Sequence, residues 1–72
     1  MAILESTKEI IGFAILTWNS EKVIGACLDS ISGLSSVEPR IVLVDNGSTD
    51  NTVLIIEKFI QRTSIPVELG RI

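Results

Sequence analysis

Two continuous apolar runs, each followed by a polar segment and then by a helical pattern, constrain this fold most. Residues 10–16 read IIGFAIL and residues 41–44 read IVLV. Apolar runs of this length are typical of strands buried on both faces of a parallel sheet. We therefore predict strands at residues 10–16 and 40–45, the second ending at Asp45.

The segment after the first run has the 3.6-residue period of an amphipathic helix. Its apolar positions are Val23, Ile24, Cys27, Leu28, Ile31 and Leu34. Asn19 or Ser20 is predicted to cap the N-terminus, and Gly33 is a natural C-terminal stop. On this stripe Cys27 is expected to be an inert core residue.

A second helical stripe follows the second run. It consists of Val53, Ile56, Phe59 and Ile60. Thr49 or Asp50 is the predicted cap, and Lys58 and Arg62 lie near the C-terminal end, where cations are favoured. Residues 64–66 should end this helix, and residues 67–69, VEL, form a predicted third strand.

The predicted order of strand, helix, strand, helix, strand favours an α/β fold with a three-stranded parallel sheet, a βαβαβ or half-Rossmann-like unit. Asn46-Gly47 is also a strong hairpin signal. A hairpin, however, would place Asp50 and Asn51 in the next strand, where both are disfavoured, and the 3.6-residue period argues for a helix there.

Right-handed crossovers in one direction put both predicted helices on one face of the sheet. The opposite apolar face then needs a cover. Residues 1–9 could fold back over it, another chain could cover it, or the sequence could be the front end of a longer protein, which fits best. We treat residues 1–72 as a single partial domain, with an N-terminal extension at 1–9 and the βαβαβ unit at 10–69.

Charge and cysteine content exclude several classes of protein. The net charge is −3, with 6 basic against 9 acidic residues and no basic cluster, so nucleic acid is not expected as a partner. One Cys and no His leave neither an internal disulfide nor a Cys-based metal site. Charges at Glu5, Lys8 and Glu9 interrupt the N-terminus, and the next apolar run is too short to span a bilayer, which predicts a cytoplasmic location.

Polar residues follow both predicted strands at the edge where parallel sheets bind ligands. TWNSE follows the first strand and DNGSTD follows the second. These loops should bring together Thr17, Asn19, Glu21, Asp45, Asn46 and Ser48 in one crevice. Neither loop contains GxGxxG or GxxxxGK[ST], which argues against a dinucleotide enzyme or a P-loop hydrolase.

The chemistry of this crevice suits a nucleoside. Asp45 could accept a hydrogen bond from a base N–H or a ribose hydroxyl, Asn46 offers a donor and an acceptor, and Trp18 could stack on a flat ring. Structural roles are the alternatives. Asp45 could cap the following turn, Asn19 and Asp50 could cap helices, and Trp18 could fill the core.

The combination of FAILTWNSEKVIGACLDSI with RIVLVDNGSTDNTVLIIEKF resembles the N-terminal portion of the family 2 glycosyltransferases, which have the A-type nucleotide-sugar-binding fold. The resemblance covers about residues 10–69. It departs from the family pattern where Leu16 replaces the usual Pro, Trp18 the common Tyr and Asn46 the frequent second Asp.

The resemblance implies that Thr17, Asn19 and Glu21 line a nucleotide pocket. It implies that Asp45 and Asn46 hold the base and ribose of a UDP- or dTDP-sugar, and that the loop is shaped by Ser48 and Asp50. The family's DXD motif, which binds Mg²⁺ or Mn²⁺, and its catalytic base have no counterpart in this sequence. Such a piece alone is expected to be inactive. Its parent would transfer a sugar from a nucleoside diphosphate to an acceptor, and could do so at a membrane surface.

A second hypothesis is a non-catalytic half-Rossmann or flavodoxin-like interaction module. Its bare sheet face would form a homodimer, because a large exposed apolar patch otherwise invites aggregation.

Overall fold

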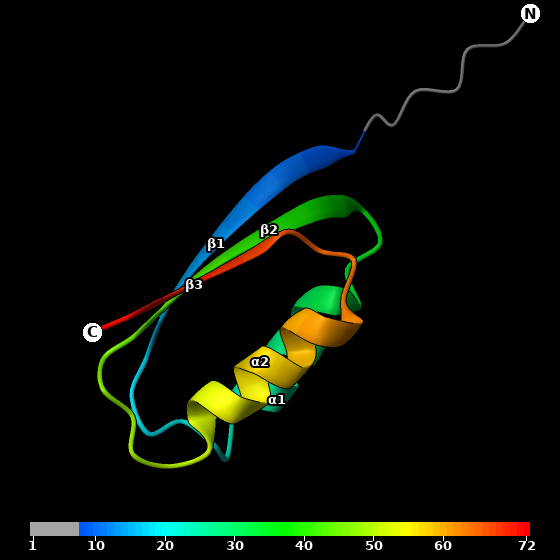
Figure 1. The fold of residues 1–72 in the computed structure, drawn as a ribbon. Helices are drawn as coiled ribbons and strands as arrows, with labels where there is room; N and C mark the ends of the chain where they lie inside the picture. Colours follow the sequence, from blue (N-terminus) through cyan, green and yellow to red (C-terminus); the bar gives the residue numbers. More distant parts are fainter. Residues whose placement is uncertain (1–7) are drawn as a thin grey trace, which may run out of the picture.

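A computed structural model describes residues 8–72, which form a three-stranded parallel sheet and two helices (Figure 1). The elements in chain order are β1 (Glu9–Thr17), α1 (Ile24–Ser32), β2 (Val37–Asp45), α2 (Thr52–Arg62) and β3 (Val67–Arg71). The strand order is β1-β2-β3, and both pairings are parallel. The predicted βαβαβ fold is confirmed, with each strand longer than predicted.

The segment after β2 is not a hairpin. Gly47 does adopt the left-handed conformation expected of a turn, with φ of 79°. The chain then leaves the sheet and enters α2 at Thr52. Parallel pairing of β2 with β3 requires such a crossover, because a two-residue turn can join only antiparallel strands.

Both helices pack on the same face of the sheet and form a second layer (Figure 1). The core lies between the layers and consists of Ile24, Leu28, Ile31, Ile41, Leu43, Ile56 and Phe59. Alternate residues of each strand supply this layer, because successive side chains of a strand point to opposite faces. At the C-terminal ends of β1 and β2, the same face carries the buried polar residues Thr17 and Asp45.

The other face of the sheet is uncovered within residues 8–72. Ile10, Leu16 and Val42 are 58%, 71% and 45% exposed. A shallow hollow of about 320 Å³ on this face is lined by Ala14, Ile15, Leu16, Val42 and Val44. This bare face is what the crossover argument predicted, and no part of residues 8–72 supplies the cover expected for it. Residues 1–7, which include most of the extension expected to fold back, lie outside the described residues.

Helix α1 departs from the prediction on one flank. Ile24, Leu28 and Ile31 are buried, but Val23, Cys27 and Leu34 are exposed. The apolar stripe is wider than the surface that the sheet and α2 cover, so Cys27 is not a core residue. Gly33 is the C-cap, as predicted.

The N-terminus of α1 has no side-chain cap, which contradicts the prediction of Asn19 or Ser20. The backbone carbonyl of Ser20 instead accepts hydrogen bonds from the N–H groups of Val23 and Ile24, at 3.0 and 2.9 Å. A backbone turn thus starts the helix and leaves the side chain of Asn19 for contacts with another loop.

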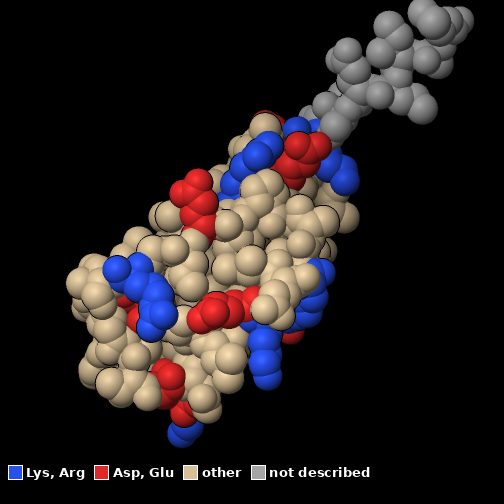
Figure 2. All heavy atoms as spheres, in the orientation of Figure 1, with Lys and Arg blue, Asp and Glu red and all other residues tan. Residues whose placement is uncertain are grey.

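Basic and acidic side chains are interspersed over a mostly uncharged surface on the side shown in Figure 2. One exposed ion pair joins the two helices, with Arg62 Nη2 2.9 Å from Asp29 Oδ1. Among residues 8–72, neither helix is long and apolar enough to cross a membrane.

Candidate functional site

The ends of β1 and β2 meet at one edge of the sheet. Thr17 is paired in register with Asp45, and the Thr17 hydroxyl donates a hydrogen bond of 2.8 Å to Asp45 Oδ1. The backbone N–H of Asn46 donates to the Thr17 carbonyl at 2.8 Å. These two bonds fix the point at which the chain leaves β2.

The Asp45 carboxylate is buried and fully engaged with the protein, with only 1% of the residue exposed. Besides the Thr17 bond, Oδ1 accepts from the Ser48 hydroxyl at 2.6 Å, and Oδ2 accepts from the Ser48 backbone N–H at 2.8 Å. Burial alone would raise the pKa of Asp45. The hydrogen bonds from Ser48 and Thr17 and the charge of Arg71 outweigh burial, so the pKa lies below its usual 3.8.

Asn19 joins the first loop to the second by reciprocal hydrogen bonds. Its backbone N–H donates to Ser48 Oγ at 2.8 Å, and its Oδ1 accepts from the Thr49 backbone N–H at 2.9 Å. Asn19 has a φ of 45°, a left-handed conformation that Asn tolerates better than most residues. Asn19 therefore lies at the junction between the two loops.

Asp50 and Glu21 form a second reciprocal link. Asp50 Oδ2 accepts from the Glu21 backbone N–H at 3.2 Å, and Glu21 Oε2 accepts from the Asn51 backbone N–H at 3.3 Å. Asp50 Oδ1 also accepts from the Thr52 N–H at 2.9 Å. The N-cap of α2 is nevertheless Asn51, which makes no side-chain cap hydrogen bond, so the predicted cap at Thr49 or Asp50 is wrong. Burial acts to raise the pKa of Asp50, but the hydrogen bonds from Thr52 and Glu21 lower it overall.

Trp18, Asn19, Glu21 and Asn46 of the predicted site are exposed at this edge, and for Trp18 and Asn46 the structure gives no side-chain hydrogen bond within residues 8–72. Trp18 is 63% exposed, so the alternative that it fills the core is wrong. Asn46 is also exposed, while its backbone N–H is bonded to β1. This edge of the sheet thus combines the buried polar residues Thr17 and Asp45 with an accessible indole and amide.

Two residues of the site were not selected from the sequence. Thr52 is 0% exposed, and its hydroxyl accepts from the Ser20 backbone N–H at 2.7 Å and donates to Asp50. Arg71 lies opposite Asp45 in the β2–β3 register, at the same edge of the sheet. The sequence did contain a signal for Arg71. It follows shortly after the predicted third strand, and the C-terminal ends of parallel strands lie at the same edge of a sheet.

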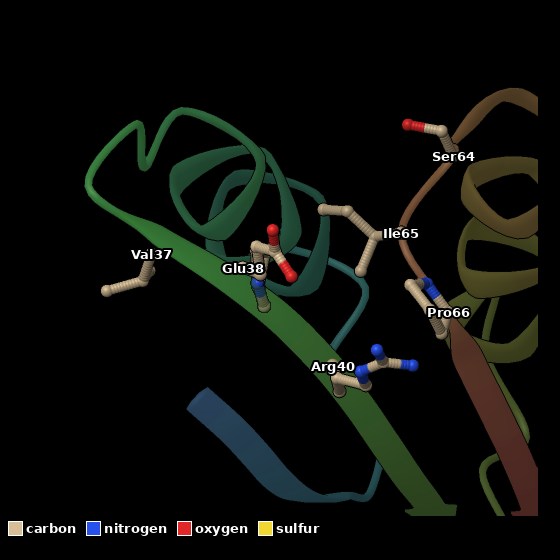
Figure 3. Close-up of a pocket in the computed structure, with 7 residues that line it drawn as sticks. Val37, Glu38, Arg40, Ser64, Ile65 and Pro66 are labelled. Carbon is tan, nitrogen blue, oxygen red and sulfur yellow. The ribbon is translucent and has the colours of Figure 1, made fainter. Parts of the chain in front are cut away.

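A hollow of about 250 Å³ lies at the opposite end of the sheet, between the start of β2 and the segment before β3 (Figure 3). Val37, Glu38, Pro39, Arg40, Ser64, Ile65 and Pro66 line it. It contains none of the predicted site residues.

The donor set of residues 8–72 does not fit a divalent metal ion. No group of three or more His, Cys, Asp or Glu in this range could hold one. The Asp45 oxygens and both oxygens of Asp50 accept hydrogen bonds from the protein instead. We therefore derive no chemical step through Mg²⁺ or Mn²⁺ from these residues.

Comparison with known families identifies the chain. Residues 13–70 match the sequence model of the family described as Glycosyl transferase family 2. The chain belongs to glycosyltransferase family 2. Neither a search of curated proteins nor a search of solved structures found a match. The matched range of this family 2 chain includes both loops at the ends of β1 and β2.

Proposed function

We propose that this family 2 chain binds the nucleoside part of a nucleotide-sugar donor in the crevice between the β1 and β2 loops. The observation that carries the proposal is the accessible pair Trp18 and Asn46, which directly follow Thr17 and Asp45, the paired ends of β1 and β2. An exposed indole can stack on a base, and a primary amide can donate to and accept from a base edge. A UDP- or dTDP-sugar is the donor class proposed, and the cytoplasm is the proposed compartment.

Arg71 extends the proposal to the diphosphate. A guanidinium recognises phosphate oxygens through paired N–H donors, and Arg71 lies at the edge of the sheet where β1 and β2 end. The charge of Arg71 also lowers the pKa of Asp45. The proposed site therefore has a flat apolar group and an amide for the nucleoside and a cation for the phosphates.

The proposed parent reaction is transfer of a sugar from the nucleoside diphosphate to an acceptor. We propose that residues 1–72 do not perform it alone, because the sequence has no DXD triplet and no counterpart of the family's catalytic base. Mass spectrometry of the source polypeptide tests whether a longer parent with a downstream DXD motif exists. Release of UDP from a UDP-sugar by the purified 72-residue chain would contradict the proposed inactivity.

Tryptophan fluorescence offers a direct test of nucleotide binding, because Trp18 is the one Trp in the chain. UDP and dTDP, each with and without Mn²⁺, should change the Trp18 emission saturably and shift the amide signals of residues 45–50. Uridine without phosphate should bind more weakly if Arg71 contacts the diphosphate. Unchanged fluorescence and amide signals at saturating nucleotide would rule the proposal out.

A second candidate function rests on the uncovered sheet face, where Leu16 is 71% exposed. A homodimer through this face would bury its apolar side chains. A three-stranded sheet with strands of 9, 9 and 5 residues offers a patch on the order of 400 Å² from ordinary strand dimensions, about half of what each partner buries in a standard interface. Equilibrium sedimentation that shows a monomer would exclude this candidate.

A further inference from the structure

The contacts of Asp45 assign it a role different from that of Asn46. Three donors from Thr17 and Ser48 occupy its carboxylate at 2.6–2.8 Å, and the residue is 1% exposed. A carboxylate that reads a base N–H or a ribose hydroxyl must be open to the ligand. Asp45 could meet this condition only if the Ser48 turn were opened.

The same bonds determine where Asn46 lies. Asp45 holds Ser48 through both its hydroxyl and its backbone N–H, which closes the turn around residues 46 and 47. The Asn46 backbone is held to β1 by its bond to the Thr17 carbonyl. The exposed Asn46 side chain is therefore presented by a turn whose shape depends on Asp45.

We propose that Asp45 is a positioning residue that does not touch the nucleoside diphosphate and supports its binding by fixing the turn that presents Asn46. The inference rests on the proposed function, since it assigns different roles to two residues of the same proposed site: Asn46 contacts the ligand and Asp45 positions the turn. The charge of Asp45 is then dispensable for binding, whereas its hydrogen-bonding geometry is required.

An Asp45→Asn substitution separates charge from geometry. The two donors at Oδ1 are hydroxyl groups, which can rotate and accept a hydrogen bond. The donor at Oδ2 is a backbone N–H, which cannot accept one. An Asn side chain fits if its NH₂ takes the Oδ1 place and its carbonyl oxygen takes the Oδ2 place. Asp45→Ala removes the acceptors and leaves the Ser48 N–H without its partner.

The experiment measures UDP and dTDP affinity by Trp18 fluorescence for the 72-residue chain and its variants, with Ser30→Ala, an exposed site on α1, as control. If Asp45 only positions the turn, Asp45→Asn should weaken affinity by no more than about threefold, whereas a lost contact to a charged group costs about tenfold or more. Asn46→Ala and Asp45→Ala should each lose tenfold or more. Amide spectra should show the Ser48 signal little changed in Asp45→Asn.

The outcomes separate this inference from the proposed function. Loss of affinity in Asp45→Asn as large as in Asn46→Ala, with the Ser48 amide unchanged, would mean that Asp45 contacts the ligand and would overturn the inference alone. If the wild-type chain binds neither nucleotide, the proposed function fails and the inference fails with it. If Asp45→Ala does not fold, the affinities of Asp45→Asn and Asn46→Ala still show whether Asp45 contacts the nucleotide.

Discussion

The two faces of the sheet differ in solvent exposure, although the same strands form both. In β2, Leu43 is fully buried under the helices, while its neighbour Val42 is 45% exposed on the other face. The covered face continues at its end into Thr17 and Asp45, so the crevice is an extension of the core. The uncovered face has no such continuation among residues 8–72. Stability and binding are therefore both expected to depend on one face.

The largest expected effect comes from matched truncations in β2. Leu43→Ala should lower the free energy of unfolding by about 2–5 kcal/mol, because it removes a buried side chain and leaves a cavity. Val42→Ala, one position away in the same strand, should cost about 1 kcal/mol or less. Urea unfolding of both variants measures the difference. Equal losses would mean that the uncovered face is buried in solution.

The polar end of the covered face should respond next. Thr52→Val leaves the Ser20 N–H without its 2.7 Å acceptor and removes one of the three donors to Asp50, which should cost about 1–3 kcal/mol. Thr49→Val is the control, because the Thr49 residue is exposed and the one hydrogen bond that the structure gives its hydroxyl, to Asn19 Oδ1, is long at 3.5 Å. Thermal unfolding compares the two. A loss in Thr49→Val equal to that in Thr52→Val would refute the special role of the buried hydroxyl.

Acid should weaken the same end of the molecule. The pKa values of Asp45 and Asp50 are lower in the folded protein than their usual 3.8, so folding favours the charged forms. Their contribution to stability is complete above that value and is lost as the pH falls through the folded pKa values. Melting temperatures should be recorded from neutral pH down to about pH 2. They should decrease as the pH is lowered through the folded pKa values. Asp45→Asn should reduce the acid dependence, and an unchanged profile would contradict the assignment.

The smallest effect on stability is expected on the uncovered face. Leu16→Lys should change the free energy of unfolding by no more than about 0.5 kcal/mol, since Leu16 is 71% exposed. It should reduce any self-association, because Lys on an exposed strand opposes contacts between sheets. Sedimentation and urea unfolding together test this prediction. A large loss of stability would show that another part of the protein covers Leu16.

Much of this architecture was predictable from sequence period alone. Continuous apolar runs marked β1 and β2, the spacing of Ile24, Leu28 and Ile31 marked α1, and short crossovers implied parallel strands with both helices on one face. The same reasoning correctly placed the polar loops at one edge. Period indicates which side of an element is apolar, but it does not indicate how much of that side a neighbour covers. The exposure of Cys27 could not be derived from it.

The internal contacts of the crevice were harder to predict. A carboxylate at the end of a strand can face a ligand or accept hydrogen bonds from its own turn, and the sequence Asp45-Asn46-Gly47-Ser48 permits both. Which of the two roles Asp45 takes depends on the distance between its carboxylate and the Thr17 hydroxyl, which lies on a different strand. Thr52 was missed for the same reason, because its acceptor role depends on the Ser20 backbone, 32 positions away.

The separation in sequence of these bonded groups has a consequence for folding. Thr17 and Asp45 are 28 positions apart, and the bonds of Asn19 with Ser48 and Thr49 span 29 and 30 positions. Contacts of such high sequence separation form only after long loops have closed, so the crevice should assemble late, once both strand–helix units have docked. A nucleotide that binds only the assembled crevice would draw the whole population toward the native state. Its effect should be a rise in the melting temperature of the entire unit that grows with ligand concentration.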